Sequence, residues 1–239
     1  MEAAVAAAAA DPAGLSLSGY GELVAGCTRC PLAKGRTQVV FGAGSPAADL
    51  MFVGEAPGFH EDKQGVPFVG AAGQLLGKLL AGIGLSREDV YIANVLKCRP
   101  PGNRDPQPDE IEACEPHLFR QIELIRPRVI ATLGNFATKL LSGKPLGITR
   151  VHGTEQEVVL GGSRVLLYPL FHPAAALYTP RMLEVLEADF RRLPGVLGRA
   201  AAAPAPDAAP AAVSAPGSAS PPAGPGRLPR AEPVQLGLF

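Results

Sequence analysis

Short apolar runs alternate with amphipathic stretches along most of the chain, and this alternation constrains the fold more than any other feature. The first three apolar runs are DLMFVG (49–54), VYIANVL (90–96) and VIATLG (129–134). Between them, leucines recur at helical spacing over 71–83, and 108–125 opens with a proline and acidic residues, which is a favourable helix start. Strands and helices in this order predict an α/β protein whose mainly parallel sheet carries helices on both faces.

Four further segments extend the pattern. A short helix is predicted at 135–141 and a closing helix at 183–193. The segments 157–160 and 164–170 flank a Gly-Gly pair, which predicts a hairpin whose second arm joins the sheet.

Ligands of such sheets bind beyond the carboxyl ends of the strands. This rule selects three loops as candidate site segments, namely 55–70, 97–105 and 172–181.

The composition changes abruptly after Gly198. Of the 40 residues from Ala200 to the end, 13 are alanine and 9 are proline. Such a segment buries too little apolar surface to offset its ordering entropy. We therefore expect a disordered arm at 1–14, one folded domain at 15–198 and a disordered tail at 199–239.

Charge and hydropathy exclude some classes of protein. The formal net charge is zero, which argues against a strongly basic, nonspecific nucleic-acid binder. No apolar run reaches the length of about 18 residues that a membrane-spanning helix requires. The N-terminus carries Glu2 in place of a basic signal-peptide region, so we expect a cytoplasmic protein that does not contact membranes. We also expect a monomer.

The chain contains four cysteines, Cys27, Cys30, Cys98 and Cys114. Buried thiols or a disulfide are the simplest interpretations. A C-x2-C pair in a turn nevertheless favours a metal site, because nothing indicates secretion. Four thiolates suit either tetrahedral zinc or an iron–sulfur cluster, and the spacing alone leaves both open.

The segment GEAPGFHEDKQGVPFVGAAG (54–73) is the most informative stretch. It places Glu55, His60, Glu61 and Asp62 among several glycines directly after a buried strand. Glycines allow the backbone to approach a ligand closely, although a solvated loop would also contain them. Phe68 is either a core anchor or a platform on which a flat ligand stacks.

Together these motifs resemble the family 4 uracil-DNA glycosylases. The resemblance rests on the four cysteines and on GEAPG (54–58), ED-x-x-G-x-PFVG (61–70), NVLKCRPPGNR (94–104) and LFHPAA (170–175), and it covers about 15–197. It implies excision of uracil from DNA in base excision repair. It also implies a [4Fe–4S] cluster on the four cysteines and a three-layer α/β/α sandwich with a four-stranded, mainly parallel sheet.

The resemblance also suggests how the base is read. Such enzymes flip the base out of the duplex and read its Watson–Crick edge. Asn94 is expected to donate to O4 and to accept from N3–H, which discriminates against cytosine. Phe68 is expected to stack on the ring, and His172 to donate to O2 as the departing base gains negative charge.

A carboxylate is expected to stabilise the oxocarbenium-like sugar and to orient water. Glu55 is the first candidate and Glu61 the second. In the best-known uracil glycosylases an aspartate follows the residue that matches Glu55, whereas Ala56 stands here beside the substrate. Family 4 members typically carry a small residue there, so the difference agrees with membership of this family. It leaves open which residue positions the water. For His60, a position on the surface without a functional role is an equally good interpretation.

Contacts to DNA are expected from basic side chains that reach phosphates. The candidates are Arg99, Arg104, Arg150 and Arg181. The alternative for each is an exposed side chain that does not contact DNA. Leu177 could wedge into the stack that the flipped base vacates, or simply pack near a helix start.

The chain ends in PVQLGLF (233–239), which is unusual after an Ala/Pro-rich linker. Its last residues resemble the QL-x-LF peptides by which bacterial DNA-processing proteins bind the replication sliding clamp. Clamp contacts are expected from Gln235, Leu236, Leu238 and Phe239, with a chance hydrophobic end as the alternative.

Two other readings compete with an enzyme. One is a non-catalytic nucleic-acid binder in which a zinc or iron–sulfur site holds the fold. The other is a small electron carrier, which is disfavoured because no flavin or nicotinamide loop is evident.

Overall fold

The computed structural model describes residues 14–202. These residues contain a six-stranded sheet in the order β1-β3-β2-β4-β6-β5. The strands are β1 (Ala43–Gly44), β2 (Leu50–Gly54), β3 (Tyr91–Asn94), β4 (Val129–Leu133), β5 (Gln156–Leu160) and β6 (Ser163–Leu170). The predicted arm, apart from Gly14, and the predicted tail beyond Ala202 lie outside the described residues.

The four central strands β3, β2, β4 and β6 pair in parallel. Every residue of β2, β3 and β4 is buried, as expected for parallel strands that helices cover on both faces. The predicted, mainly parallel sheet is therefore confirmed, although it has six strands where four were predicted. The predicted hairpin is also confirmed, since β5 pairs antiparallel with β6. The short edge strand β1, which pairs antiparallel with β3, was not predicted.

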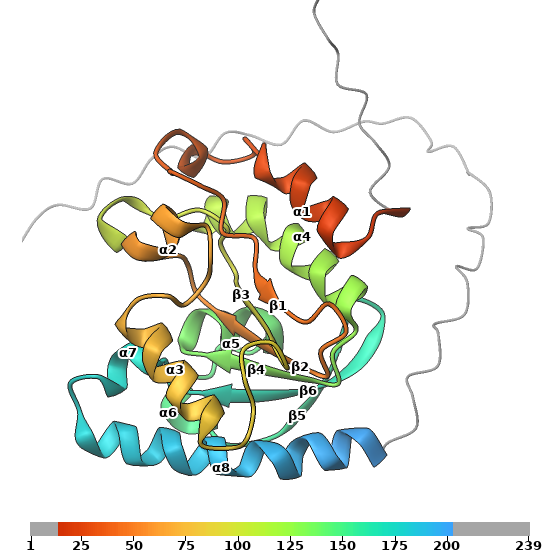
Figure 1. Cartoon of the computed structure of the whole chain (residues 1–239), viewed down its shortest axis with the longest axis vertical. Helices are drawn as coiled ribbons and strands as arrows, with labels where there is room; N and C mark the ends of the chain where they lie inside the picture. Colours follow the sequence, from red (N-terminus) through yellow and green to blue (C-terminus); the bar gives the residue numbers. More distant parts are fainter. Residues whose placement is uncertain (1–13, 203–239) are drawn as a thin grey trace, which may run out of the picture. The chain divides into compact units, whose positions relative to one another are not determined.

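Helices cover both faces of the sheet (Figure 1). They are α1 (Leu17–Ala25), α2 (Phe59–Gln64), α3 (Ala71–Ala81), α4 (Pro108–Ile125), α5 (Asn135–Ser142), α6 (Ile148–Val151), α7 (Pro173–Ala176) and α8 (Pro180–Ala202). Two 3-10 turns lie at Pro31–Lys34 and Pro101–Asn103.

Side chains that alternate along β2 enter two separate cores. Leu50 and Phe52 pack with residues of α3 and α8, whereas Met51 and Val53 pack with residues of α4 and α5. This alternation follows from the period of two in a strand. The predicted three-layer α/β/α arrangement is confirmed.

The helices differ from the predictions most clearly at α8 and α2. The closing helix α8 runs to Ala202, so residues 199–202 are helical and not part of a disordered tail. Pro194 suggested an earlier end, but Leu193 and Val196 on either side of it are buried in the core and hold the helix together. The helix α2 lies inside the segment expected to be a loop, because six residues are too short to show an apolar period.

Candidate active site

The three predicted loops meet at one end of the sheet. Gly54 and Asn94, the last residues of β2 and β3, are paired in register, and His172 lies two residues beyond the end of β6. The rings of Phe68 and His172 stack with centroids 5.7 Å apart and an interplanar angle of 29°. Residues from three distant parts of the chain therefore form one site.

Phe68 lies directly against the end of β2. A Cβ atom on Gly54 would approach the Phe68 Cζ to 2.6 Å and the Asn94 Oδ1 to 2.4 Å. Such distances do not occur between real side chains, so only glycine fits between the ring and the amide. The glycine at the end of β2 thus sets the spacing of the two predicted base-reading residues.

The backbone of Phe68 is held in a left-handed conformation, with φ of 55°. A bulky residue rarely adopts this conformation, and residues that do so cluster at functional sites. Arg87 stabilises the turn, since its guanidinium donates to the carbonyl oxygens of Pro67 (2.6 Å) and Phe68 (3.0 Å). Gly73 also supports it, because a Cβ atom there would lie 1.7 Å from the Phe68 carbonyl oxygen.

The hydrogen bonds of His172 fix its tautomer. Its Nδ1 accepts from the backbone N–H of Ala174 at 3.1 Å, so the proton of the neutral ring resides on Nε2. Burial lowers the pKa of His172 to about 4, with a small opposing effect from Glu61. The side chain is therefore neutral near pH 7 and carries an Nε2–H that can donate to a ligand.

Asn94 is 2% exposed, and its Oδ1 is a buried acceptor without a hydrogen-bond partner within residues 14–202. An unpaired buried acceptor costs about 1–3 kcal/mol, which a ligand donor would recover. The Asn94 backbone is held firmly, because its carbonyl accepts from the Lys97 Nζ at 2.7 Å.

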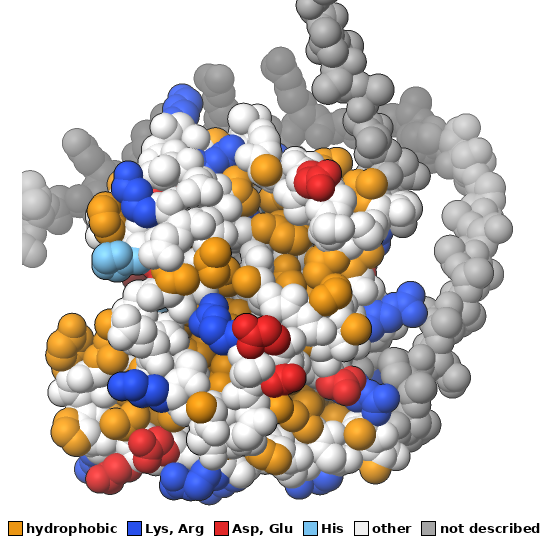
Figure 2. All heavy atoms as spheres, in the orientation of Figure 1, with side chains coloured by type: hydrophobic (Ala, Val, Ile, Leu, Met, Phe, Trp, Pro, Cys, Tyr) orange, Lys and Arg blue, Asp and Glu red, His pale blue; other side chains and the backbone are white. Residues whose placement is uncertain are grey.

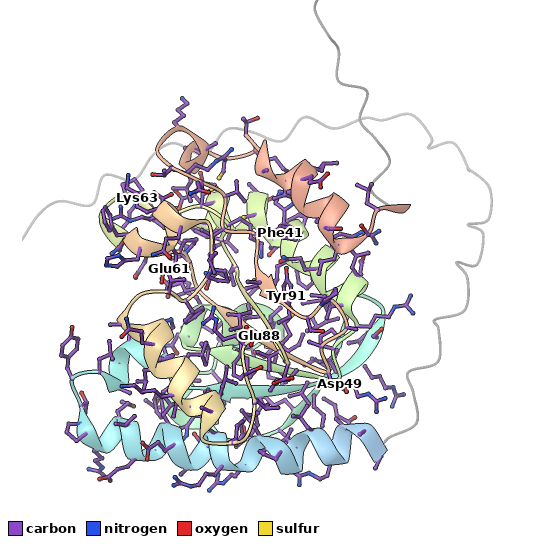
Figure 3. All side chains as sticks on the ribbon, in the orientation of Figure 1. Phe41, Asp49, Glu61, Lys63, Glu88 and Tyr91 are labelled. Atoms are coloured by element: carbon purple, nitrogen blue, oxygen red, sulfur yellow. The ribbon has the colours of Figure 1, made fainter. Side chains whose placement is uncertain are left out.

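Lys97 is fully buried and connects several parts of the site. Its Nζ also donates to the Gln121 Oε1 at 2.5 Å, and the Gln121 amide in turn donates to Tyr91 and to the Phe41 carbonyl (both labelled in Figure 3). Its backbone N–H donates to the Cys114 sulfur at 3.2 Å. Burial lowers the pKa of Lys97 to about 8. One residue thus contacts both the Asn94 turn and a predicted cluster ligand.

The acidic residues of the 54–73 segment have different surroundings. Glu55 is half-buried, and burial followed by the charge of Asp105 raises its pKa. Glu61 accepts from the backbone N–H groups of Val69 and Gly70, both at 2.9 Å, so this carboxylate caps the start of α3. Between the two predicted carboxylates, Glu55 is the one whose oxygens accept no backbone hydrogen bond within residues 14–202.

The remaining residues of this segment agree with simple structural roles. The Asp62 carboxylate is buried and accepts from the Thr37 backbone N–H at 2.8 Å. His60 is exposed, and Ala56 packs at the border of the core on the α4 side.

The predicted DNA-contacting side chains differ in how far contacts within the protein hold them. Arg104 forms a two-pronged ion pair with Glu110, at 2.5 and 2.9 Å, which raises the pKa of Arg104 and lowers that of Glu110. Arg99 donates to Asn103. Leu177 is 37% exposed at the end of α7, and its neighbour Tyr178, which the sequence reading missed, is 89% exposed. Arg150 and Arg181 are exposed.

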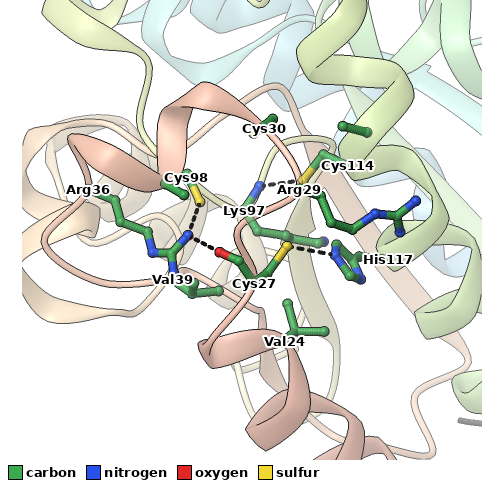
Figure 4. A pocket seen from close by; sticks show the side chains of 12 residues that line it. Val24, Cys27, Arg29, Cys30, Arg36, Val39, Lys97, Cys98, Cys114 and His117 are labelled. Carbon is green, nitrogen blue, oxygen red and sulfur yellow. Dashed lines mark hydrogen bonds between the residues drawn. The ribbon is translucent and has the colours of Figure 1, made fainter. Parts of the chain in front are cut away.

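All four cysteines line one cavity between α1, α4 and the loop after β3 (Figure 4). None of them forms a disulfide. Within residues 14–202, no three His, Cys, Asp or Glu side chains lie close enough to hold a single metal ion. The donor set consists of four thiols that line a shared space, and four thiolates suit either tetrahedral zinc or an iron–sulfur cluster.

Among residues 14–202, three of the four cysteine sulfur atoms take part in hydrogen bonds, and those of Cys98 and Cys114 accept them. His117 Nε2 lies 3.4 Å from Cys27, Arg36 donates to Cys98 at 3.5 Å, and the Lys97 backbone N–H donates to Cys114. The other ring nitrogen of His117 contacts the Tyr20 hydroxyl at 2.8 Å. Donors of this kind stabilise negatively charged thiolates.

Sequence reasoning did not identify Arg87, Gln121, Arg36 or His117. Each lies far along the chain from a residue it supports, and no local pattern marks Arg87, Gln121 or Arg36. Only His117 had a signal, since it lies three residues after Cys114 and therefore on the same face of α4.

Known proteins are similar to this chain over most of the described residues. Residues 41–193 match the family model described as the uracil DNA glycosylase superfamily. A type-4 uracil-DNA glycosylase of Archaeoglobus fulgidus is 50% identical over 177 residues, covering 72% of this chain and 89% of the relative. One of Thermotoga maritima is 51% identical over 154 residues, covering 64% and 79%. A type-5 uracil-DNA glycosylase of Pyrobaculum aerophilum is 35% identical over 170 residues, covering 65% and 72%.

Proposed function

The chain belongs to the uracil DNA glycosylase superfamily, and from this premise we propose that it is a DNA-repair enzyme that hydrolyses the N-glycosidic bond of uracil in DNA. The product is an abasic site. The observation that carries the proposal is the buried Oδ1 of Asn94 beside the Phe68 ring, which has no hydrogen-bond partner among the described residues. A flat base with an N–H on its edge is the ligand that satisfies both features.

Uracil is read by its edge. Its N3–H donates to the Asn94 Oδ1, and the amide N–H of the same side chain donates to O4. Cytosine carries an acceptor at N3 and an amino group at C4, so it would leave both amide groups unpaired. Sites that hydrogen-bond their substrate in this way discriminate strongly against analogues without the matching groups. The Phe68 ring stacks on the face of the base.

The bond between C1′ and N1 breaks as the sugar becomes oxocarbenium-like and the uracil ring takes the electron pair. His172 donates its Nε2–H to O2, where the negative charge develops. A neutral donor placed in advance stabilises this charge without rearrangement of solvent. The pKa of about 4 supports this role, because the ring stays neutral at physiological pH.

Water attacks C1′, and Glu55 accepts its proton. The raised pKa of Glu55 supports this assignment, since a more basic carboxylate is a better proton acceptor. The second candidate, Glu61, is already occupied by two backbone N–H groups, so we assign it to holding the Phe68 turn.

We assign a [4Fe–4S] cluster to Cys27, Cys30, Cys98 and Cys114. When bound, the cluster supplies metal–thiolate bonds that join the N-terminal segment to the loop after β3 and to α4. Hydrolysis moves no electrons, so the role is structural. Lys97 extends this support to the substrate, because it contacts both Cys114 and the Asn94 carbonyl.

The test uses the purified full chain and a labelled oligonucleotide with one uracil, heated in alkali after incubation. We expect strand cleavage at uracil and none at thymine or cytosine in matched oligonucleotides. Visible absorbance from the cluster together with an intact uracil strand would instead favour a non-catalytic nucleic-acid binder.

We further propose that the C-terminal peptide binds the bacterial sliding clamp. Residues 235–239 lie outside the described part of the chain, so the support comes from the sequence alone. A long linker would then keep the enzyme near newly made DNA at high effective concentration. A synthetic 230–239 peptide should bind the clamp, and a peptide with Leu238 and Phe239 changed to alanine should not. Equal signals from the two peptides would contradict this part of the proposal.

A further inference from the structure

The helix α2 presents an aromatic ring to solvent beside the candidate active site. Phe59, its first residue, is 50% exposed. The Arg99 guanidinium carbon lies 5.2 Å from the ring centroid, the Lys63 Nζ lies 5.9 Å from it, and the His60 ring meets it edge-on at 5.5 Å. In Figure 2, hydrophobic, basic and histidine side chains adjoin one another where Figure 1 draws α2.

The charge that this helix presents to solvent differs from the formal charge of its residues. The helix contains Glu61, Asp62 and Lys63, so its formal charge is negative. However, Asp62 is buried against Thr37, and Glu61 accepts from the two backbone N–H groups at the start of α3. Figure 3 shows Glu61 on the side of α2 toward that turn and Lys63 on the outer side. The side that carries Phe59 is therefore cationic.

This surface is continuous with the active site through both of its loops. The helix begins five residues after Gly54 and ends close to the Phe68 turn, which Glu61 holds. Arg99 follows Cys98 in the loop that carries Asn94 at its start. The contact between Arg99 and Phe59 thus joins the two loops at the edge of the base-reading site.

We propose that Phe59, Lys63 and Arg99 form a docking surface for the uracil-bearing DNA strand where it leaves the active site. This inference rests on the proposed function. An exposed ring contacts a neighbouring base without regard to its identity, and the two cations contact the flanking phosphates. Aromatic rings combined with basic side chains are the usual means of binding single-stranded nucleic acid.

The test measures DNA binding and catalysis separately in the full chain. Binding is followed by fluorescence anisotropy with a single-stranded oligonucleotide that carries a tetrahydrofuran abasic analogue, and catalysis by kcat and KM on the matching uracil oligonucleotide. Phe59→Ala should weaken binding and raise KM by roughly five- to a hundredfold, the range for loss of one base–aromatic stack. The kcat should stay within about twofold, because Phe59 does not contact the reacting atoms. Phe59→Trp should retain binding.

The cations give a second, independent readout. Each phosphate contact contributes about 0.7 to the slope of log K against log salt for a single strand, so K63Q with R99Q should flatten that slope by about 1.4. Val159→Ala and Lys144→Gln are the controls, since they change an exposed hydrophobic residue of β5 and an exposed lysine in the loop after α5. Neither should alter binding.

Unchanged binding and KM in Phe59→Ala would overturn the inference, as would a fall in kcat alone or an equal loss in Val159→Ala. A loss that Phe59→Trp shares would also overturn it, because the ring would then not be the determinant. If the wild-type chain fails to excise uracil, the proposed function itself is wrong, and this outcome is separate from any effect of the variants.

Discussion

Gly54→Ala tests the geometry of the base-reading site with a single methyl group. Its Cβ would lie 2.4 Å from the Asn94 Oδ1 and 2.6 Å from the Phe68 Cζ, whereas carbon atoms pack at about 3.5 Å. The ring or the amide must therefore move by about 1 Å. A displacement of this size at a reacting centre costs about a hundredfold in rate, or about 2.7 kcal/mol of activation free energy. We expect single-turnover excision of uracil to slow by that factor.

Gly77→Ala is the matched control. Gly77 lies inside α3, and a Cβ atom there meets nothing within 4 Å. This variant should keep wild-type kinetics and gain about 0.5–1 kcal/mol of stability, because alanine is the better helix former. Circular dichroism melts should show that both variants fold. Excision by Gly54→Ala within threefold of the wild-type rate would show that the contact between Gly54, Phe68 and Asn94 does not govern catalysis.

Four other changes probe the remaining roles. Asn94→Asp should slow uracil excision by about 10- to 100-fold in single-turnover assays, since the donor to O4 is lost in a buried site, and unchanged kinetics would refute the edge-reading role. His172→Ala should lose about 10²–10³ in rate, and a loss below tenfold would place the leaving-group donor elsewhere. The kcat should fall as the pH drops through the raised pKa of Glu55, because the ionised form is the proton acceptor, and this acidic limb should vanish in Glu55→Gln; a limb that persists would point to another group. Cys30→Ala should lose visible absorbance and thermal stability together, and a stable, colourless, fully active variant would show that the cluster is dispensable.

Most of the architecture could be predicted because burial has a local signature. The central strands are apolar along their whole length, and the segment 108–125 begins and ends where the structure places α4. The limits of α8 were harder to predict, since Pro194 resembles a helix end unless the burial of Leu193 and Val196 is known. The helix α2 could not be predicted, because its six residues are too few to show an apolar periodicity.

The sequence by itself determined the layered α/β fold, the loops that carry the site and the cysteines that could share a metal group, because these depend on spacing along the chain. Only the tertiary structure decided which groups face one another. The unpaired oxygen of Asn94, the strained turn at Phe68 and the support of that turn by Arg87 come from segments that the parallel crossovers bring together. Orientation separated Glu55 from Glu61, since one carboxylate caps a helix and the other does not. Strand register and packing set these contacts between distant residues, and no local pattern of residues records them.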